Sequence, residues 1–142
     1  MSEQNVELHR RAIEAFNSRD VESAIANADP SIELHSSMTV PGGAVYHGHD
    51  GLRRYVRDLE EAWGAGNPRV EPEAFFDLGE HTLVFAVVRG RGKLSGAEVG
   101  GPVTHVAKWQ DGRCVYFRFH LKREDALEEL GVSEDALTPI AP

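Results

Sequence analysis

Apolar side chains in the first half of the chain recur with two different periods. From Val6 to Phe16 they return every three to four residues, which is the spacing of one helix face. From Ile32 to Thr39 apolar and polar residues alternate, which is the spacing of a strand with one face on a core. This half of the chain predicts three helices, over about 6–17, 21–28 and 50–63, and two strands, over 32–39 and 44–47.

The second half of the chain predicts a run of antiparallel strands. Asp111-Gly112 separates two segments rich in Val, Phe, Tyr and Trp, and this pattern strongly favours a β-hairpin. Gly79-Glu80 indicates another tight turn, and Gly131 indicates the end of a short amphipathic helix. We expect strands over 69–78, 81–91, 102–110 and 113–122, and a helix over 123–130.

Helices that precede a run of strands are typical of an α+β layer fold. We expect three N-terminal helices to pack on one face of a curved, mostly antiparallel sheet, with a short C-terminal helix at the end. Such a sheet, closed by helices, makes a cone-shaped α+β barrel with an interior pocket. One domain is expected over 1–132, followed by a C-terminal tail over 133–142. The outer face of the sheet is then free to form a homodimer.

Composition narrows the choice of partners. The 15 Lys and Arg residues against 23 Asp and Glu residues leave a formal net charge of −8, which argues against a nucleic-acid partner. A single cysteine, Cys114, excludes an internal disulfide framework. No apolar run approaches the length of a membrane span, and the N-terminus lacks the apolar core of a signal peptide. We therefore expect a cytoplasmic protein without a membrane or nucleic-acid partner.

Three ordered segments resemble the SnoaL-like branch of the nuclear transport factor 2-like superfamily. They are NVELHRRAIEAFNSRDVESAIANADPSIELH, VYHGHDGLRRYVRDLEEAW and THVAKWQDGRCVYFRFHLKREDALEELGV, and together they extend over about 5–132. The resemblance implies a cone fold that binds a small apolar ligand. That superfamily places isomerases, cyclases, dehydratases, epoxide hydrolases and non-catalytic binding modules on one scaffold, so the fold alone does not select among them.

The resemblance to the ketosteroid isomerases of this superfamily implies one candidate catalytic residue. Their general base corresponds to His35, and histidine readily exchanges a proton near neutral pH. Their oxyanion-binding Tyr and protonated Asp correspond to Ala12 and Thr104, so that pair of donors is lost here. We interpret His35 as a candidate general base, with a purely structural histidine as the alternative.

Large aromatic and hairpin residues are the candidates for lining the pocket. The resemblance implies that Tyr55 lines it, and Tyr46 and Tyr55 are favoured because each adds a hydroxyl to an apolar ring. The candidate ligand-binding residues are Phe16, Tyr46, Tyr55, Trp63, Thr104, Val106 and Phe119.

Two further groups of residues contain histidines, and each has a plainer explanation than a functional site. A two-residue turn would pair His105 with Arg118 and bring His120 close, which predicts a polar patch at a dimer interface or, less favoured, an anion site. His47-Gly48-His49 is only a weak metal signal, since a loop before a helix explains it equally well. We expect neither a metal nor a cofactor.

Two functions stay open on the sequence alone. The first is a cofactor-independent enzyme of the isomerase, cyclase or hydratase type, which would act by proton transfer on an apolar oxygenated metabolite. The alternative is a homodimeric module of the same fold that binds a ligand or a protein partner without catalysis.

Overall fold

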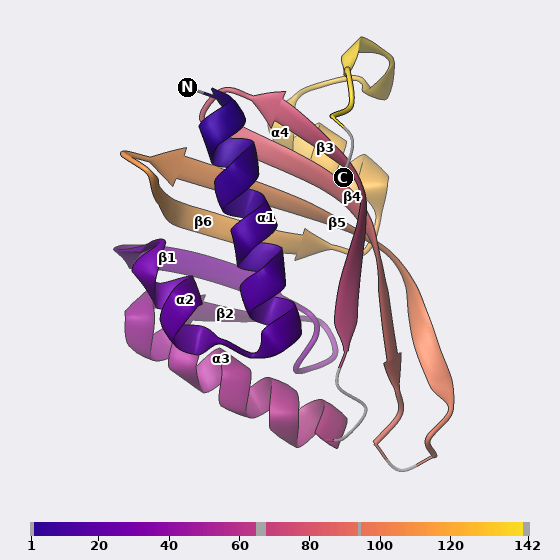
Figure 1. Ribbon diagram of the computed structural model, residues 1–142. Helices are drawn as coiled ribbons and strands as arrows, with labels where there is room; N and C mark the ends of the chain where they lie inside the picture. The colour runs from indigo at the N-terminus through magenta and orange to yellow at the C-terminus, as the bar shows by residue number, and fades with distance from the viewer. Residues whose placement is uncertain (1, 65–67, 94, 141–142) are drawn as a thin grey trace.

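The computed structural model describes residues 2–64, 68–93 and 95–140 (Figure 1). Within these residues one six-stranded sheet has the strand order β2-β1-β6-β5-β4-β3. Neighbouring strands are antiparallel, except that β1 and β6 are parallel. The helices and strands are α1 (Ser2–Ser18), α2 (Val21–Ala26), β1 (Ala28–Ser36), β2 (Ala44–His47), α3 (Gly48–Trp63), β3 (Arg69–Leu78), β4 (His81–Arg91), β5 (Glu98–Gln110), β6 (Arg113–His120) and α4 (Arg123–Leu130).

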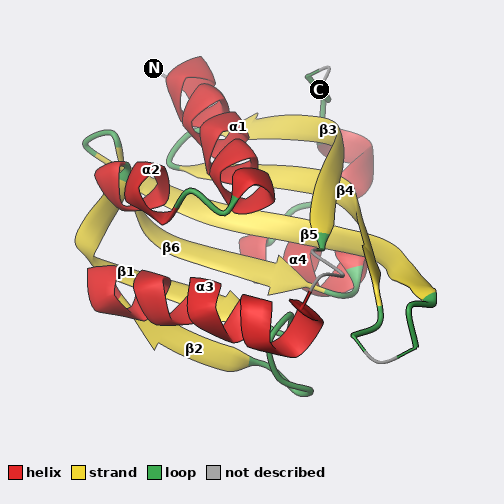
Figure 2. Cartoon of the chain, turned by 60° about the horizontal axis from the view of Figure 1, so that its bottom comes forward, coloured by secondary structure: helices red, strands yellow, loops and turns green. Residues whose placement is uncertain are grey.

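The helices are divided between the two faces of the curved sheet. Helices α1, α2 and α3 cover the inner face, and α4 lies against the outer face, as Figures 1 and 2 show. The main core fills the space between α1, α3 and the inner face, and a smaller one lies under α4. This arrangement confirms the expected α+β class and cone fold. The outer face is less open than expected, because α4 covers part of it, and the homodimer through that face stays a prediction.

The first strand begins earlier than its apolar pattern indicates. Strand β1 begins at Ala28 and ends at Ser36, so Pro30 lies inside a strand that the pattern places after it. Parallel pairing joins Ala28 to Cys114, and the register then shifts before Glu33 pairs with Tyr116. Proline lacks a backbone N–H, and such an irregularity is where a strand tolerates it.

The hairpin of β5 and β6 has a different register from the one expected. The turn pairs Gln110 with Arg113 as predicted, but a bulge then separates the Trp109–Cys114 pair from the Lys108–Tyr116 pair, which leaves Val115 as the extra residue. A one-residue shift changes which residues face each other along the rest of the ladder.

The polar patch predicted for the hairpin is therefore wrong. His105 pairs with Phe119, and both side chains face the inner core, while Arg118 pairs with Val106 on the outer face. His120 also faces outward, where its Nε2 atom lies 2.6 Å from Oε1 of Glu129 in α4. His105 is thus separated from the other two by the sheet itself.

The C-terminal tail is attached to the edge of the sheet. After a short 3-10 helix, η2 (Glu134–Ala136), Ile140 forms a β-bridge with Phe75 of β3 through two backbone hydrogen bonds of 3.1 and 2.6 Å. Among the described helices, none is both long and apolar enough to cross a lipid bilayer.

Asn17 fastens the end of α1 to the edge strand β3. Its Nδ2 donates to the carbonyl of Val70 at 2.9 Å, and its Oδ1 accepts from the Val70 backbone N–H at 2.8 Å. The side chain thus occupies both hydrogen-bonding groups of Val70 on the strand's free edge, as a further strand would. This clamp holds α1 over the sheet.

We expect Asn17→Ala to lower the free energy of unfolding by about 1–3 kcal/mol, because it leaves the backbone groups of Val70 without partners. Urea denaturation followed by circular dichroism measures this. Ser18→Ala is the matched control: it removes only side-chain bonds to the preceding turn of α1 and should change the value by about 0.5 kcal/mol or less. Equal effects of the two substitutions would contradict the role of Asn17.

Candidate functional site

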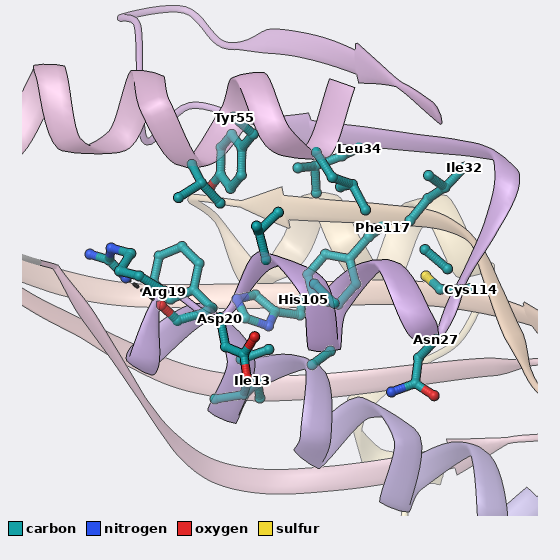
Figure 3. Close-up of a pocket in the computed structure, with 18 of the residues that line it drawn as sticks. Ile13, Arg19, Asp20, Asn27, Ile32, Leu34, Tyr55, His105, Cys114 and Phe117 are labelled. Carbon is teal, nitrogen blue, oxygen red and sulfur yellow. Dashed lines mark hydrogen bonds between the residues drawn. The ribbon is translucent and has the colours of Figure 1, made fainter. Parts of the chain in front are cut away.

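A cavity of about 100 Å³ lies between the inner face of the sheet and the three N-terminal helices (Figure 3). Ligand pockets more often measure roughly 300–1,000 Å³, so this one suits a compact molecule. Most of its wall is apolar. The apolar lining residues are Ala12, Ile13, Ala15 and Phe16 of α1, Val21 and Ala24 of α2, Ala28, Ile32 and Leu34 of β1, Leu52, Val56 and Leu59 of α3, and Phe117 and Phe119 of β6.

Most polar side chains in the wall already make hydrogen bonds within the protein. Three of them donate to backbone carbonyls: Arg19 to those of Phe16 and Pro68, Asn27 to that of Ser23, and Cys114 to that of Tyr116. The other three bond to polar groups nearby: Asp20 accepts from Ser23, Tyr55 shares a bond with the Ser36 hydroxyl, and Trp109 donates to the Thr82 hydroxyl. The exception is Nε2 of His105. It is the one buried side-chain nitrogen or oxygen of the described residues that has no hydrogen-bond partner.

His105 is held rigidly by the aromatic residues beside it. Strand alternation turns its side chain to the inner face, where only 1% of the residue is exposed. Its ring centre lies 4.4 Å from that of Phe119 and 5.0 Å from that of Phe117. Figure 3 shows His105 in the middle of the lining residues, with Tyr55 on the α3 side and Ile13 on the α1 side.

The other ring nitrogen of His105 belongs to a buried chain of hydrogen bonds. Its Nδ1 lies 3.4 Å from Nε2 of His9 in α1. Nδ1 of His9 lies 2.6 Å from the Thr82 hydroxyl of β4, which also accepts a bond of 2.9 Å from the indole N–H of Trp109. His9 and Thr82 are completely buried. The chain therefore crosses the core from β5 to α1 and back to the sheet.

Burial keeps both imidazoles uncharged at neutral pH. It lowers the pKa of His105 to about 3. Burial, together with the nearby His105, also lowers the pKa of His9 well below its usual value. An uncharged imidazole with one unpaired nitrogen can form a hydrogen bond but is a poor base at neutral pH.

The other titratable groups of the wall also do not change their charge near neutral pH. Burial raises the pKa of the Tyr55 hydroxyl well above its usual value and that of the Cys114 thiol to about 12. The two hydrogen bonds from Ser23 lower the pKa of the Asp20 carboxyl. Burial lowers the pKa of Arg19, but a guanidinium stays charged.

Only part of the expected ligand-binding set lines the cavity. Phe16, Tyr55 and Phe119 do so. The Tyr46 hydroxyl is instead bonded to Thr39 and Asp58, and the Trp63 indole N–H donates to the carbonyl of Met38. Thr104 and Val106 alternate with His105 along β5 and face outward, where Val106 joins the core under α4. The structure therefore corrects the placement of these four: Tyr46, Trp63, Thr104 and Val106.

His35, the candidate base, lies away from this cavity. It alternates with the inward-facing Leu34 and Ser36 on β1 and so occupies the outer face, where its Nε2 contacts Oε1 of Glu33. Its ring lies 5.4 Å from that of Tyr116. His35 is therefore not placed to act on a ligand in this cavity.

Sequence reasoning missed the residues that give the cavity its polar atom. The expected register assigns His105 to a polar patch at a dimer interface. His9 lies within the apolar pattern that predicts the first helix. A histidine within such a stripe is the available signal, since it has to find polar partners inside the core.

The sequence of this chain matches a known family. The family model of the SnoaL-like domain matches residues 9–117, well over half of the chain. The chain belongs to the SnoaL-like domain family. This confirms the resemblance seen in the sequence, and the fold suggests small-molecule binding. A comparison with curated protein sequences finds no match.

Solved structures share the same fold. A nuclear transport factor 2-like protein of unknown function from Burkholderia pseudomallei has 25% identity and a TM-score of 0.73, over 88% of this chain and 95% of that one. TerC, co-crystallised with polyporic acid, has 22% identity and a TM-score of 0.73, over 89% and 97%. A protein of ketosteroid isomerase-like fold from Catenulispora acidiphila, in complex with trimethylamine, has 13% identity and a TM-score of 0.72, over 91% and 95%.

The lowered pKa of His105 predicts a loss of stability in acid. The pKa of its imidazole is about 6.5 in the unfolded chain and about 3 in the folded chain. Between these values the unfolded state binds more protons, so acidification favours unfolding.

Relative to His105→Leu, we expect the wild-type free energy of unfolding to fall by about 1 kcal/mol more as the pH is lowered from about 6 to about 5. Urea denaturation at a series of pH values measures both proteins. Parallel stability curves would show that His105 titrates normally in the folded protein.

Proposed function

We propose that this protein binds a small, largely apolar molecule in the cavity and holds it by a hydrogen bond to Nε2 of His105. The observation that carries this proposal is the unpaired Nε2 atom itself. Leaving a buried polar group unpaired costs about 1–3 kcal/mol, and a ligand that pairs with it recovers that free energy. The rest of the wall offers apolar contact on every side, from α1, α2, α3 and the sheet.

The size and polarity of the cavity narrow the range of ligands. Its volume of about 100 Å³ favours a compact molecule, such as one built on a single ring. A charged group would have to give up its hydration against an apolar wall, which is costly without a charged partner. Arg19 and Asp20, the charged residues of the wall, are already engaged at the junction of α1 and α2.

Binding without catalysis agrees best with the chemistry of the wall. General acid–base catalysis works best with a group whose pKa lies near the working pH. The pKa values of the titratable side chains that line the cavity are shifted away from neutral pH, except that of Arg19, which stays charged. An isomerase- or cyclase-type reaction is the second candidate, because a neutral N–H in an apolar site can polarise a carbonyl group.

Cyclohexanone and cyclohexene are suitable probes, because they share a six-membered ring and differ in the carbonyl. We expect both to shift NMR signals of residues around the cavity in the wild-type protein. In His105→Leu the affinity for cyclohexanone, relative to that for cyclohexene, should fall roughly tenfold, which corresponds to about 1.4 kcal/mol.

The same substitution at His35, on the outer face, is the matched control and should leave this ratio unchanged. An equal ratio in wild type and His105→Leu would contradict the proposed anchor, and failure of both probes to bind would contradict the site. Carried out in D₂O, the titration also tests the second candidate. Exchange of the cyclohexanone α-protons faster than in buffer, and dependent on His105, would favour catalysis over binding alone.

A further inference from the structure

We infer that the buried chain Trp109–Thr82–His9 fixes His105 as a hydrogen-bond donor toward the cavity, so that the site selects ligands with an acceptor oxygen, such as ketones and enones. This inference rests on the proposed function, because it takes the cavity as the binding site. His9, Thr82 and Trp109 act here as positioning residues. They make a hydrogen-bond acceptor necessary in the ligand, but they do not themselves contact its oxygen.

The donor-to-acceptor direction of these hydrogen bonds is set at Trp109. The indole nitrogen of Trp109 can only donate, so its 2.9 Å contact occupies a lone pair of the Thr82 hydroxyl. The single proton of that hydroxyl then needs an acceptor. Among the described residues, the remaining side-chain partner of Oγ1 is Nδ1 of His9, at 2.6 Å. Nδ1 of His9 therefore accepts.

The proton positions on the two histidines follow. A neutral imidazole carries one N–H, so His9 carries it on Nε2 and donates toward Nδ1 of His105, 3.4 Å away. His105 Nδ1 is then an acceptor, and its own proton lies on Nε2. That is the buried atom without a partner, on a residue that lines the cavity.

The relative orientation of the rings suits such a bond. The planes of the His9 and His105 rings differ by 2°, and their centres are 5.6 Å apart. This separation nearly equals the 3.4 Å between the two nitrogens plus the distance from each nitrogen to its own ring centre. The nitrogens therefore lie on the line between the ring centres. The rings are edge to edge, and a ring N–H points along that direction.

The opposite direction is disfavoured by the same geometry. It would require Thr82 to accept from both Trp109 and His9, which leaves its own buried proton without an acceptor among the described side chains. Such an unpaired donor costs about 1–3 kcal/mol. Protonation of His9 would also break the chain, because both its nitrogens would then donate. Complete burial among the rings of Phe75, Phe117 and Trp109 opposes that charge.

The site selects between ligands by the group that contacts the Nε2–H of His105. A carbonyl oxygen accepts from Nε2, the one buried side-chain nitrogen or oxygen without a partner in the described part of the chain. A ligand that can only donate would bring a second N–H against the first and leave both unpaired. A site built for one hydrogen-bonding partner discriminates strongly against an analogue that lacks it.

NMR of ring nitrogens in the ¹⁵N-labelled full-length protein tests the chain directly, because protonated and unprotonated imidazole nitrogens have different shifts. Without ligand, we expect both His9 and His105 to carry the proton on Nε2. Thr82→Val keeps the side-chain shape but removes the hydroxyl, and should give a mixture of tautomers on both rings. Thr82→Ser restores the hydroxyl and should restore the wild-type pattern. Protonation of His105 on Nδ1 in the wild type, or an unchanged pattern in Thr82→Val, would overturn the inference.

Ligand binding tests the selection separately. Cyclohexanone only accepts hydrogen bonds, and pyrrole presents a ring N–H donor. We expect wild type and Thr82→Ser to prefer cyclohexanone, and that preference to fall about tenfold in Thr82→Val. Equal affinities in the wild type, with His105 protonated on Nε2, would overturn the selection but not the site. Failure of cyclohexanone to bind the wild type would overturn the proposed function, while the ligand-free spectra decide the hydrogen-bond chain on their own.

Discussion

Nε2 of His105 lies inside an apolar enclosure whose described residues offer it no hydrogen-bond partner. Most of the surrounding structure maintains this condition. The rings of Phe117 and Phe119 pack against the imidazole, and the bulge in the hairpin sets the register that places Phe119 opposite His105. The neighbouring polar side chains are hydrogen-bonded to other partners. An unpaired buried polar group is costly, and this cost is the reason for proposing that a ligand pairs with it.

The SnoaL-like fold supplies the enclosure, and this chain supplies its own chemistry within it. The resemblance to ketosteroid isomerases assigns their two oxyanion donors to Ala12 and Thr104, neither of which offers such a donor to the cavity. Thr104 faces outward, and the next residue along β5, His105, faces the cavity instead. A neutral imidazole there is a donor without a strong base beside it. This combination differs from the general base and two oxyanion donors that the resemblance to ketosteroid isomerases implies.

Much of the fold could be predicted because its signals are local. The helix over 48–63, the strands over 69–78 and 81–91, and the turn at Asp111-Gly112 follow from apolar period and turn residues within a short stretch. The extra residue Val115 could not be placed in this way, since a bulge depends on how two strands twist against each other. The error mattered, because the predicted register paired His105 with Arg118 and assigned it to a surface patch.

The candidate site was less accessible to sequence reasoning than the fold. Phe16, Tyr55 and Phe119 line the cavity, as could be expected for large aromatic groups and, for Tyr55, from the family resemblance. The chain from Trp109 to His105 joins residues from β5, β4 and α1 that are 27 to 96 positions apart. No local pattern links them. The sequence does contain a histidine at position 9 in an apolar stripe. Its hydrogen-bond partners, Thr82 and His105, can be identified only from the packing of α1 against the sheet.

A crystal structure of the protein with bound cyclohexanone tests the central claim most directly. We expect the ligand oxygen to lie within hydrogen-bonding distance of His105 Nε2, with the contacts of His9, Thr82 and Trp109 unchanged. A ligand whose oxygen points to any other group, or a His105 ring that turns away from His9 to meet it, would contradict the account.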